Sequence, residues 1–182
     1  MTLSTRALPL LLAALALSAG LTACAVSMGV PRTKADALPV ALFDAAGRAV
    51  GNVVLTADSA GLDLKFDVHD LTPGAHGVHV HAAGRCERPD FLTAGAHLDD
   101  GAHHHGRLNP AGWHLGDLPN LLVGPDGTAR VTLRLGSRSP GFELKRLFDG
   151  DGSAVIIHAG PDDGLTDPSG GSGARIACGI IA

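Results

Sequence analysis

Apolar and polar side chains alternate along much of the chain after residue 38, and this is the period of half-buried β-strands. Residues 62–68 show it most clearly, because Leu, Leu, Phe and Val alternate there with Asp, Lys and Asp. Residues 131–135 repeat the alternation after Gly124-Pro125-Asp126-Gly127, a sequence that favours a hairpin turn. Similar apolar runs predict further strands at 40–44, 50–57, 77–82, 115–123, 154–158 and 175–181.

The segments between these runs are short and rich in Gly and Pro, apart from two long connections at about 83–113 and 159–174. No segment shows the apolar period of a helix of three turns, and we find no internal repeat. Many short strands joined by Gly/Pro turns predict an all-β, antiparallel sandwich or barrel. Long loops on such a scaffold are usually functional or disordered, and these two carry candidate ligands and an arginine.

The amino-terminal segment has the pattern of an export signal. Arg6 precedes an apolar run from Ala7 to Leu21 that is short for a membrane span, so residues 1–23 are predicted to be a signal peptide. Leu21-Thr22-Ala23-Cys24 resembles the lipobox of bacterial lipoproteins, which predicts lipidation of Cys24 and a membrane anchor. The alternative is an ordinary secretory signal whose cysteine is incidental. Residues 24–38 are expected to form a flexible tether before a folded domain at 39–182.

Charge and cysteine content narrow the partners and the compartment. The 14 basic residues are scattered among 18 acidic ones, with a formal net charge of −4, so the clustered basic face of a nucleic-acid-binding protein is absent from the sequence. If Cys24 carries lipid, Cys86 and Cys178 remain, and an exported protein most simply pairs them. The disulfide would close a loop of roughly 90 residues, worth at most ~4–5 kcal/mol in the chain-entropy model. Two buried free thiols are the alternative.

Histidines in and after the predicted strand at 77–82 indicate a metal site. Side chains two apart on a strand face the same side, so His79 and His81 present their imidazoles together while Val78 and Val80 enter the core. A site rich in imidazole and poor in thiolate suits Cu(II), and a histidine cluster closed by one carboxylate suits Zn(II). The chain therefore offers a two-metal site, whose further candidate ligands are His97, His114, Asp117 and His158.

Residues 71–182 resemble the copper/zinc superoxide dismutase family, most of all its bacterial exported branch. The resemblance rests on Gly77-Val78-His79-Val80-His81, Gly84-Arg85-Cys86, Ala94-Gly95-Ala96-His97, His105-Gly106, His114-Leu115-Gly116-Asp117-Leu118-Pro119-Asn120 and Gly173-Ala174-Arg175-Ile176-Ala177-Cys178-Gly179. It implies a Greek-key β-sandwich or barrel of about eight strands with two long functional loops. It also implies an enzyme that converts superoxide to dioxygen and hydrogen peroxide.

The resemblance also implies roles for single residues. It places copper, cycling between Cu(II) and Cu(I), on His79, His81, His97 and His158, and zinc on His97, His105, His114 and Asp117. His97 would then bridge the metals and donate a proton, while zinc, which has no redox chemistry, orients it. Arg175 matches the family's arginine beside copper, which attracts and orients the superoxide anion. Asp162 matches an aspartate that hydrogen-bonds one copper and one zinc histidine, with Asp163 as the runner-up.

Some features leave alternatives open. In the run His103-His104-His105, the interval of eight from His97 selects His105 for zinc, with His104 next, and the other two are expected to be solvated or to collect copper weakly. His69 and His76 lie outside the ligand pattern and are interpreted as a strand-end and a turn residue. Leu98-Asp99-Asp100 departs from the family, whose members usually have an aromatic residue, Asp or Asn, and Pro there, so a looser zinc loop is expected.

Three functions were weighed against these features. An anchored superoxide dismutase of the periplasm or cell envelope uses every motif, with superoxide and a membrane as partners and homodimer formation left open. A noncatalytic copper or zinc carrier on the same fold would leave Arg175 and Asp162 idle. An adhesion sandwich does not account for the ligand spacing. The first function is the one that the sequence favours.

Overall fold

The structure is a computed structural model that describes residues 37–58, 61–101, 103–135 and 145–182. By its internal contacts the chain divides into residues 1–31 and 32–182, and every described residue belongs to the second unit. The predicted signal peptide, Cys24 and all but the last two residues of the predicted tether lie outside the described residues. Within the described ranges, no helix has the length and apolar character needed to cross a membrane.

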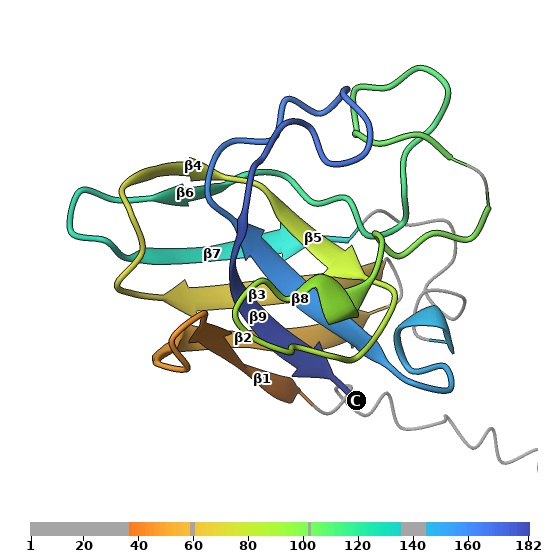
Figure 1. Ribbon diagram of the computed structural model, residues 1–182. Coiled ribbons are helices and arrows are strands. Elements are labelled where there is room, and N and C mark those ends of the chain that lie inside the picture. Colours follow the sequence, from red (N-terminus) through yellow and green to blue (C-terminus); the bar gives the residue numbers. More distant parts are fainter. Residues whose placement is uncertain (1–36, 59–60, 102, 136–144) are drawn as a thin grey trace, which may run out of the picture. The chain divides into compact units, whose positions relative to one another are not determined.

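The described residues include nine β-strands, one short 3-10 helix, η1, and helical residues at 145–147 (Figure 1). The strands are β1 (Leu38–Asp44), β2 (Ala49–Asp58), β3 (Gly61–Val68), β4 (Gly74–His76), β5 (Val78–His81), β6 (Leu121–Val123), β7 (Ala129–Arg134), β8 (Ser153–His158) and β9 (Arg175–Ile181), and η1 is Leu92–Ala94. All pairings are antiparallel. The predicted all-β antiparallel class is confirmed.

Seven strands form one curled sheet in the order β5-β8-β9-β1-β2-β3-β7, and β4 pairs with β6 in a separate ribbon (Figure 1). In β3 the predicted alternation is confirmed, since Leu62, Leu64, Phe66 and Val68 are all buried. They pack in one apolar core with residues of the other strands, including Val78 and Val80 of β5. Removing such side chains from water is the main favourable contribution to folding.

The strands β5 and β8 differ from the rest because they are buried on both faces. In β8, Val155 and Ile157 belong to the main core, whereas Ile156 packs under the loop that follows β5, against Phe91 and Cys178. A strand covered on both faces reads as a continuous apolar run, and the sequence of β8 does so. The long loop therefore places the histidine face of β5 inside the protein.

One predicted strand, residues 115–123, is much shorter in the structure, where only β6 (Leu121–Val123) remains. The preceding residues cross over β5 instead, with the Val80 amide donating to Gly116 O at 2.9 Å and the Gly116 amide to Leu98 O at 2.8 Å. A β-carbon at Gly116 would collide with the Val80 carbonyl, so this close crossing requires glycine. Pro119 has no amide hydrogen for a ladder bond.

Part of the long loop after β5 lies beside the long loop after β8, near the end of β8 and the start of β5 (Figure 1). One runs from residue 82 to 120 and the other, between β8 and β9, from 159 to 174. They are joined where the Leu108 amide donates to Gly164 O at 3.1 Å. Gly106, with a φ of 100°, packs so closely on Gly164 that a β-carbon would not fit. The candidate ligands lie under this pair of loops.

Candidate metal centre

Four histidines from distant parts of the chain converge beside β5 and β8. His79 and His81 come from β5, His158 ends β8, and His97 lies in the loop after β5. One ring nitrogen from each lies within 4.8 Å of the others, and all four residues are buried. The structure thus brings together the four residues that the sequence analysis expected around copper.

Three of these rings are held through one nitrogen and leave the other without any partner. His79 Nδ1, His81 Nε2 and His158 Nε2 are buried and make no hydrogen bond. The opposite nitrogens lie 2.7 Å from Asp162 Oδ2, 2.9 Å from Gly95 O and 3.0 Å from Gly173 O, respectively. A buried polar atom without a partner costs about 1–3 kcal/mol. Three such nitrogens in one place fit a metal ion as their common partner.

A second set surrounds the carboxylate of Asp117. Its Oδ1 lies 2.8 Å from His97 Nδ1, 3.1 Å from His105 Nδ1 and 3.4 Å from His114 Nδ1. Its Oδ2 accepts from the amides of Gly106 at 2.8 Å and His114 at 3.0 Å, which fixes the orientation of the carboxylate. Tetrahedral zinc with bonds of about 2.0–2.1 Å has ligand atoms roughly 3.3 Å apart, so the three distances from Asp117 Oδ1 fit that ion.

The two sets share His97, which lies between them. His79 also approaches the second set, since its ring has a nitrogen within 4.8 Å of donor atoms of His97, His105 and Asp117. The hydrogen bonds resolve this overlap: His79 Nε2 is engaged by Asp162, and its free Nδ1 belongs with the free nitrogens of the first set. The Nδ1 atoms of His105 and His114, at 3.1 and 3.4 Å from Asp117 Oδ1, belong with Asp117.

Burial keeps the imidazoles of the first set neutral. It lowers the pKa of His97 and His158 to about 4 and that of His81 to about 2, and it also lowers the pKa of His79. A neutral imidazole has a lone pair for a metal, so these residues are ready to coordinate at neutral pH.

The second set has the opposite electrostatics. Burial acts to lower the pKa of His105, but hydrogen bonds and charge from Asp117 and Asp162 outweigh it and raise the pKa to about 9. The hydrogen bond to Asp117 also raises the pKa of His114. Burial opposes ionisation of Asp117, yet hydrogen bonds from His105, His114 and His97 hold its pKa well below the usual range. This set is organised around a negative charge.

Asp162 connects the two sets from the loop between β8 and β9. Its carboxylate lies 2.7 Å from His79 Nε2 and 2.9 Å from His105 Nε2. The Asp162 amide donates to Asn120 Oδ1 at 2.9 Å, and the Asn120 side-chain amide donates back to Asp162 O at 2.8 Å. Asp163 instead accepts from Thr166 at the surface. The geometry therefore matches the bridging position expected of Asp162 and not of its neighbour.

Arg175, at the start of β9, lines a cavity of about 570 Å³ together with His97 and His158. Its guanidinium donates from Nη1 to Phe91 O at 2.7 Å and from Nη2 to Gly95 O at 2.8 Å. Burial lowers the pKa of Arg175, but a guanidinium stays protonated at any physiological pH. The side chain is thus a fixed positive charge beside the first histidine set.

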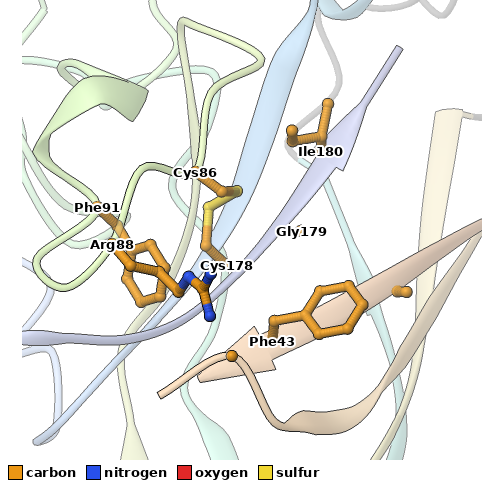
Figure 2. A pocket seen from close by; sticks show the side chains of 9 residues that line it. Phe43, Cys86, Arg88, Phe91, Cys178, Gly179 and Ile180 are labelled. Carbon is orange, nitrogen blue, oxygen red and sulfur yellow. A yellow bond between two sulfur atoms is a disulfide. The ribbon is translucent and has the colours of Figure 1, made fainter. Parts of the chain in front are cut away.

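The predicted disulfide is confirmed, and it fixes the loop that holds Arg175. Cys86 and Cys178 are bonded across 92 residues, with their Cα atoms 5.8 Å apart. Figure 2 shows the bridge between this loop and β9, beside Arg88 and Phe91. These residues, with Phe43 on the opposite wall, line a separate cavity of about 500 Å³ that contains none of the histidines.

His76 contributes to the centre, although the sequence analysis interpreted it as a turn residue outside the site. It is 1% exposed, and its Nδ1 lies 2.7 Å from His158 O and its Nε2 2.8 Å from Thr72 O. It therefore ties the backbone of a candidate ligand to the preceding loop. The sequence did contain one indication of its burial. Residue 76 is separated by even numbers of residues from the core valines Val78 and Val80, so the alternation of a strand places it on the same side.

The remaining histidines separate as expected. His104 pairs with Asp167 at 2.8 Å and its side chain is 58% exposed, whereas the His105 side chain is fully buried against Asp117. His69 is exposed at the end of β3 and lies 2.9 Å from Asp70. The interval of eight from His97 thus selects the histidine that faces the carboxylate.

Comparisons with known proteins agree with this centre. A family model described as copper/zinc superoxide dismutase (SODC) matches residues 49–181. The chain is 44% identical over 142 residues to superoxide dismutase [Cu-Zn] of Caulobacter vibrioides, covering 74% of this chain and 79% of the relative. It is 43% identical over 159 residues to superoxide dismutase-like protein YojM of Bacillus subtilis, covering 84% of this chain and 79% of the relative.

Solved structures agree as well. A crystal structure of a SOD-like protein from Bacillus subtilis superposes with a TM-score of 0.73 at 43% identity, covering 79% of this chain and 97% of that one. The Cu/Zn superoxide dismutase from Brucella abortus gives a TM-score of 0.67 at 35% identity, with 81% and 100% covered. The family model matches most of the chain, and the alignments with both relatives cover most of each relative's length. The chain therefore belongs to the copper/zinc superoxide dismutase family.

Proposed function

We propose that the protein is a superoxide dismutase with copper on His79, His81, His97 and His158 and zinc on His97, His105, His114 and Asp117. One observation carries this proposal: His97 lies between two groups of metal-binding atoms. On one side are the unpartnered ring nitrogens of His79, His81 and His158. On the other side, the Nδ1 atoms of His105 and His114 face the carboxylate of Asp117. When bound, copper would supply one-electron redox chemistry and zinc a redox-silent positive charge. Family membership supports the same reaction.

The chain's own residues would orient and protonate the reacting species. His97 faces Asp117 through Nδ1, so Nε2 is the atom directed toward the other three imidazoles. We expect His97 to take up a proton at Nε2 and to pass it to the departing peroxide, with Nδ1 held on the zinc side. Asp162 would keep His79 and His105 in one tautomer, because it accepts from the nitrogens that do not face a metal.

Arg175 would bind the substrate. Superoxide is a small anion, and the guanidinium lines a cavity together with His97 and His158. Two carbonyl groups, of Phe91 and Gly95, already fix the guanidinium, so little side-chain entropy is lost when the anion arrives. Gly95 O also accepts from His81 Nδ1 at 2.9 Å, which couples the position of Arg175 to that of a copper ligand.

The proposal includes the location of the enzyme. The Cys86–Cys178 disulfide supports an oxidising compartment, and the segment ending in Leu21-Thr22-Ala23-Cys24 supports export and lipidation at Cys24. We therefore propose an enzyme of the periplasm or cell envelope, anchored to a membrane. Metabolic labelling with a palmitate analogue tests the anchor, since Cys24→Ser should abolish incorporation. The sequence leaves homodimer formation open, and light scattering of the purified domain can determine it.

The experiment for the activity combines metal analysis with a superoxide assay. Reconstituted protein should contain one copper and one zinc per chain and should remove superoxide only when copper is present. Arg175→Ala should keep both metals and lose much of the activity, because it removes the fixed cation and no ligand. Fully metallated wild-type protein without dismutase activity would overturn the proposal and favour a metal carrier.

A further inference from the structure

Phe91 has a backbone conformation that is rare for an aromatic residue. Its φ of 56° and ψ of 23° lie in the left-handed region, directly before η1. Among the described residues, the only other non-glycine residue with a positive φ is Asp70, a residue type that tolerates this region. A bulky residue keeps such a conformation only where the surrounding structure holds it, and such positions cluster at functional sites. Phe91 is therefore held by its surroundings against its own backbone preference.

Burial of the side chain holds this conformation. Phe91 is 1% exposed and belongs to the small apolar cluster under the loop after β5, together with Ile156 and Cys178. Figure 2 shows Phe91 beside the Cys86–Cys178 disulfide. The Phe91 amide also donates to Glu87 O at 3.0 Å. Glycine would adopt the positive φ more easily but would bury no side chain, so packing and not backbone preference accounts for a phenylalanine here.

The conformation aims the Phe91 carbonyl at Arg175. Phe91 O accepts from Arg175 Nη1 at 2.7 Å, and Gly95 O, directly after η1, accepts from Nη2 at 2.8 Å. Within the described residues, these are the two hydrogen bonds of the guanidinium. At an ordinary negative φ the Phe91 peptide would turn and its carbonyl would leave the guanidinium, which would then be held by Gly95 alone.

Phe91 itself does not reach the substrate. It is not among the described residues that line the cavity containing His97, His158 and Arg175. It lines instead the separate cavity beside the disulfide, with Phe43 on the opposite wall (Figure 2). An influence of Phe91 on an anion in the first cavity therefore passes through a neighbour, and Arg175 is the charged neighbour that its carbonyl contacts.

We propose that Phe91 is a positioning residue for Arg175: its buried ring holds a left-handed turn, and the carbonyl of this turn keeps the guanidinium beside the first histidine set. The inference rests on the proposed function, in which Arg175 binds superoxide. Without the ring, the turn relaxes toward negative φ and the guanidinium loses one of its two anchors. The positive charge stays in the protein but spends less time where it attracts the anion.

The test is a double-mutant cycle between Phe91→Ala and Arg175→Ala in full-length protein loaded with copper and zinc. Two quantities are measured: the rate constant for superoxide loss, and the affinity for azide, a small anionic probe that is followed through the copper absorption spectrum. Phe91→Ala alone should lower both about tenfold. In the Arg175→Ala background it should change neither, because the Phe91 carbonyl then has no guanidinium to hold.

Three further variants separate positioning from general damage to the fold. Phe91→Leu refills most of the buried space and should recover most of both losses. Phe43→Ala is the matched control, since it removes the aromatic ring on the opposite wall of the same cavity, and it should change neither quantity. If Phe91→Ala fails to retain its metals, Phe91→Val replaces it in the cycle with the same expectation, because a β-branched residue stays apolar but resists a positive φ.

A second readout needs no copper. Hydrogen exchange at the Arg175 guanidinium, followed by NMR in copper-free protein, should be faster in Phe91→Ala than in wild-type protein. The inference is overturned by unchanged azide affinity and exchange in Phe91→Ala. It is also overturned by an equal loss of azide affinity with and without Arg175, which would mean that Phe91 acts through the copper ligands. Neither readout involves dismutation, so an inactive wild-type protein would refute the proposed function and leave both readouts valid.

Discussion

The proposed copper half and the proposed zinc half of the centre both consist mainly of imidazoles, yet the protein builds them differently. Three of the four copper-side histidines lie on β5 and β8, whose backbones are fixed by sheet pairing. The zinc-side ligands all lie in the loop between β5 and β6. Burial lowers the pKa values on the copper side, whereas Asp117 raises those of His105 and His114 on the zinc side.

This difference indicates how each half obtains its order. The copper-side rings are positioned by strand register and anchored by carbonyl groups, so that their free nitrogens converge without any counter-charge. The zinc-side rings are positioned by attraction to one buried carboxylate, which also holds the loop backbone through Gly106 and His114. We therefore expect the folded strands to position the copper-side ligands. On the zinc side, we expect attraction to Asp117 to help the loop to fold.

The largest expected effect comes from removing a strand-borne ligand. His81→Ala should abolish copper binding and dismutation, because the ring nitrogen cannot be replaced from the rigid strand. Zinc should stay near one equivalent per chain, since none of the zinc-side residues lies on β5. Elemental analysis and a superoxide assay measure both. Loss of both metals together would contradict the independence of the two halves.

The next effect is on the stability of the metal-free protein. Asp117→Asn removes the charge that the buried His97 and His105 and the partly buried His114 face, and breaking such a buried pair costs about 3–5 kcal/mol. Urea unfolding at pH 7 in the presence of a chelator measures this loss. The control is Asp67→Asn, which breaks an exposed pair with Arg130 and should cost less than about 1 kcal/mol. Similar losses in the two variants would refute an organising role for Asp117.

The opposite pKa shifts predict different pH dependences of the affinities for zinc and for copper. His105, with a pKa raised to about 9, holds a proton at neutral pH that zinc must displace. Zinc affinity should therefore rise about tenfold per pH unit as the pH approaches 9 and then level off. Copper affinity of the zinc-free protein should be flat over the same range, since burial lowers the pKa of His97 and His158 to about 4. Competition with a chelator at several pH values measures both slopes.

Equal slopes for the two metals would contradict this account. A zinc slope that persists above pH 9 would show that a group other than His105 releases the proton.

Local sequence patterns account for part of the proposed copper side and for little of the proposed zinc side, for the same structural reason. Alternation in a strand places His79 and His81 on one face, and it also predicted β3 and the buried side of β5. The path of the zinc loop depends on contacts that no local pattern contains, such as the crossing of Gly116 over Val80. The strand predicted at 115–123 was wrong for this reason.

Other parts of the site required a known family or the coordinates. The roles of Arg175 and Asp162 came from the family resemblance, because a lone arginine and a loop aspartate carry no spacing signal. His76 was missed because its partners are carbonyl oxygens of His158 and Thr72, and backbone atoms leave no trace in a sequence. Such contacts depend on tertiary structure alone.

The smallest expected effect is at Asp162, which joins the two halves. It is also the effect that distinguishes best between zinc affinity and copper affinity. Asp162→Asn removes the negative charge and leaves one accepting oxygen where two now serve His79 and His105, so the hydrogen bonds to these rings weaken. Since His79 is also held by β5 while His105 depends on side-chain partners in a loop, zinc affinity should fall about 10- to 100-fold and copper affinity less. Asp163→Asn, which changes an exposed neighbour bonded to Thr166, should alter neither. A greater loss of copper affinity than of zinc affinity would mean that Asp162, and not the strand, positions His79. The copper side would then depend on a loop carboxylate as the zinc side does, and the contrast between the two halves would fail at Asp162.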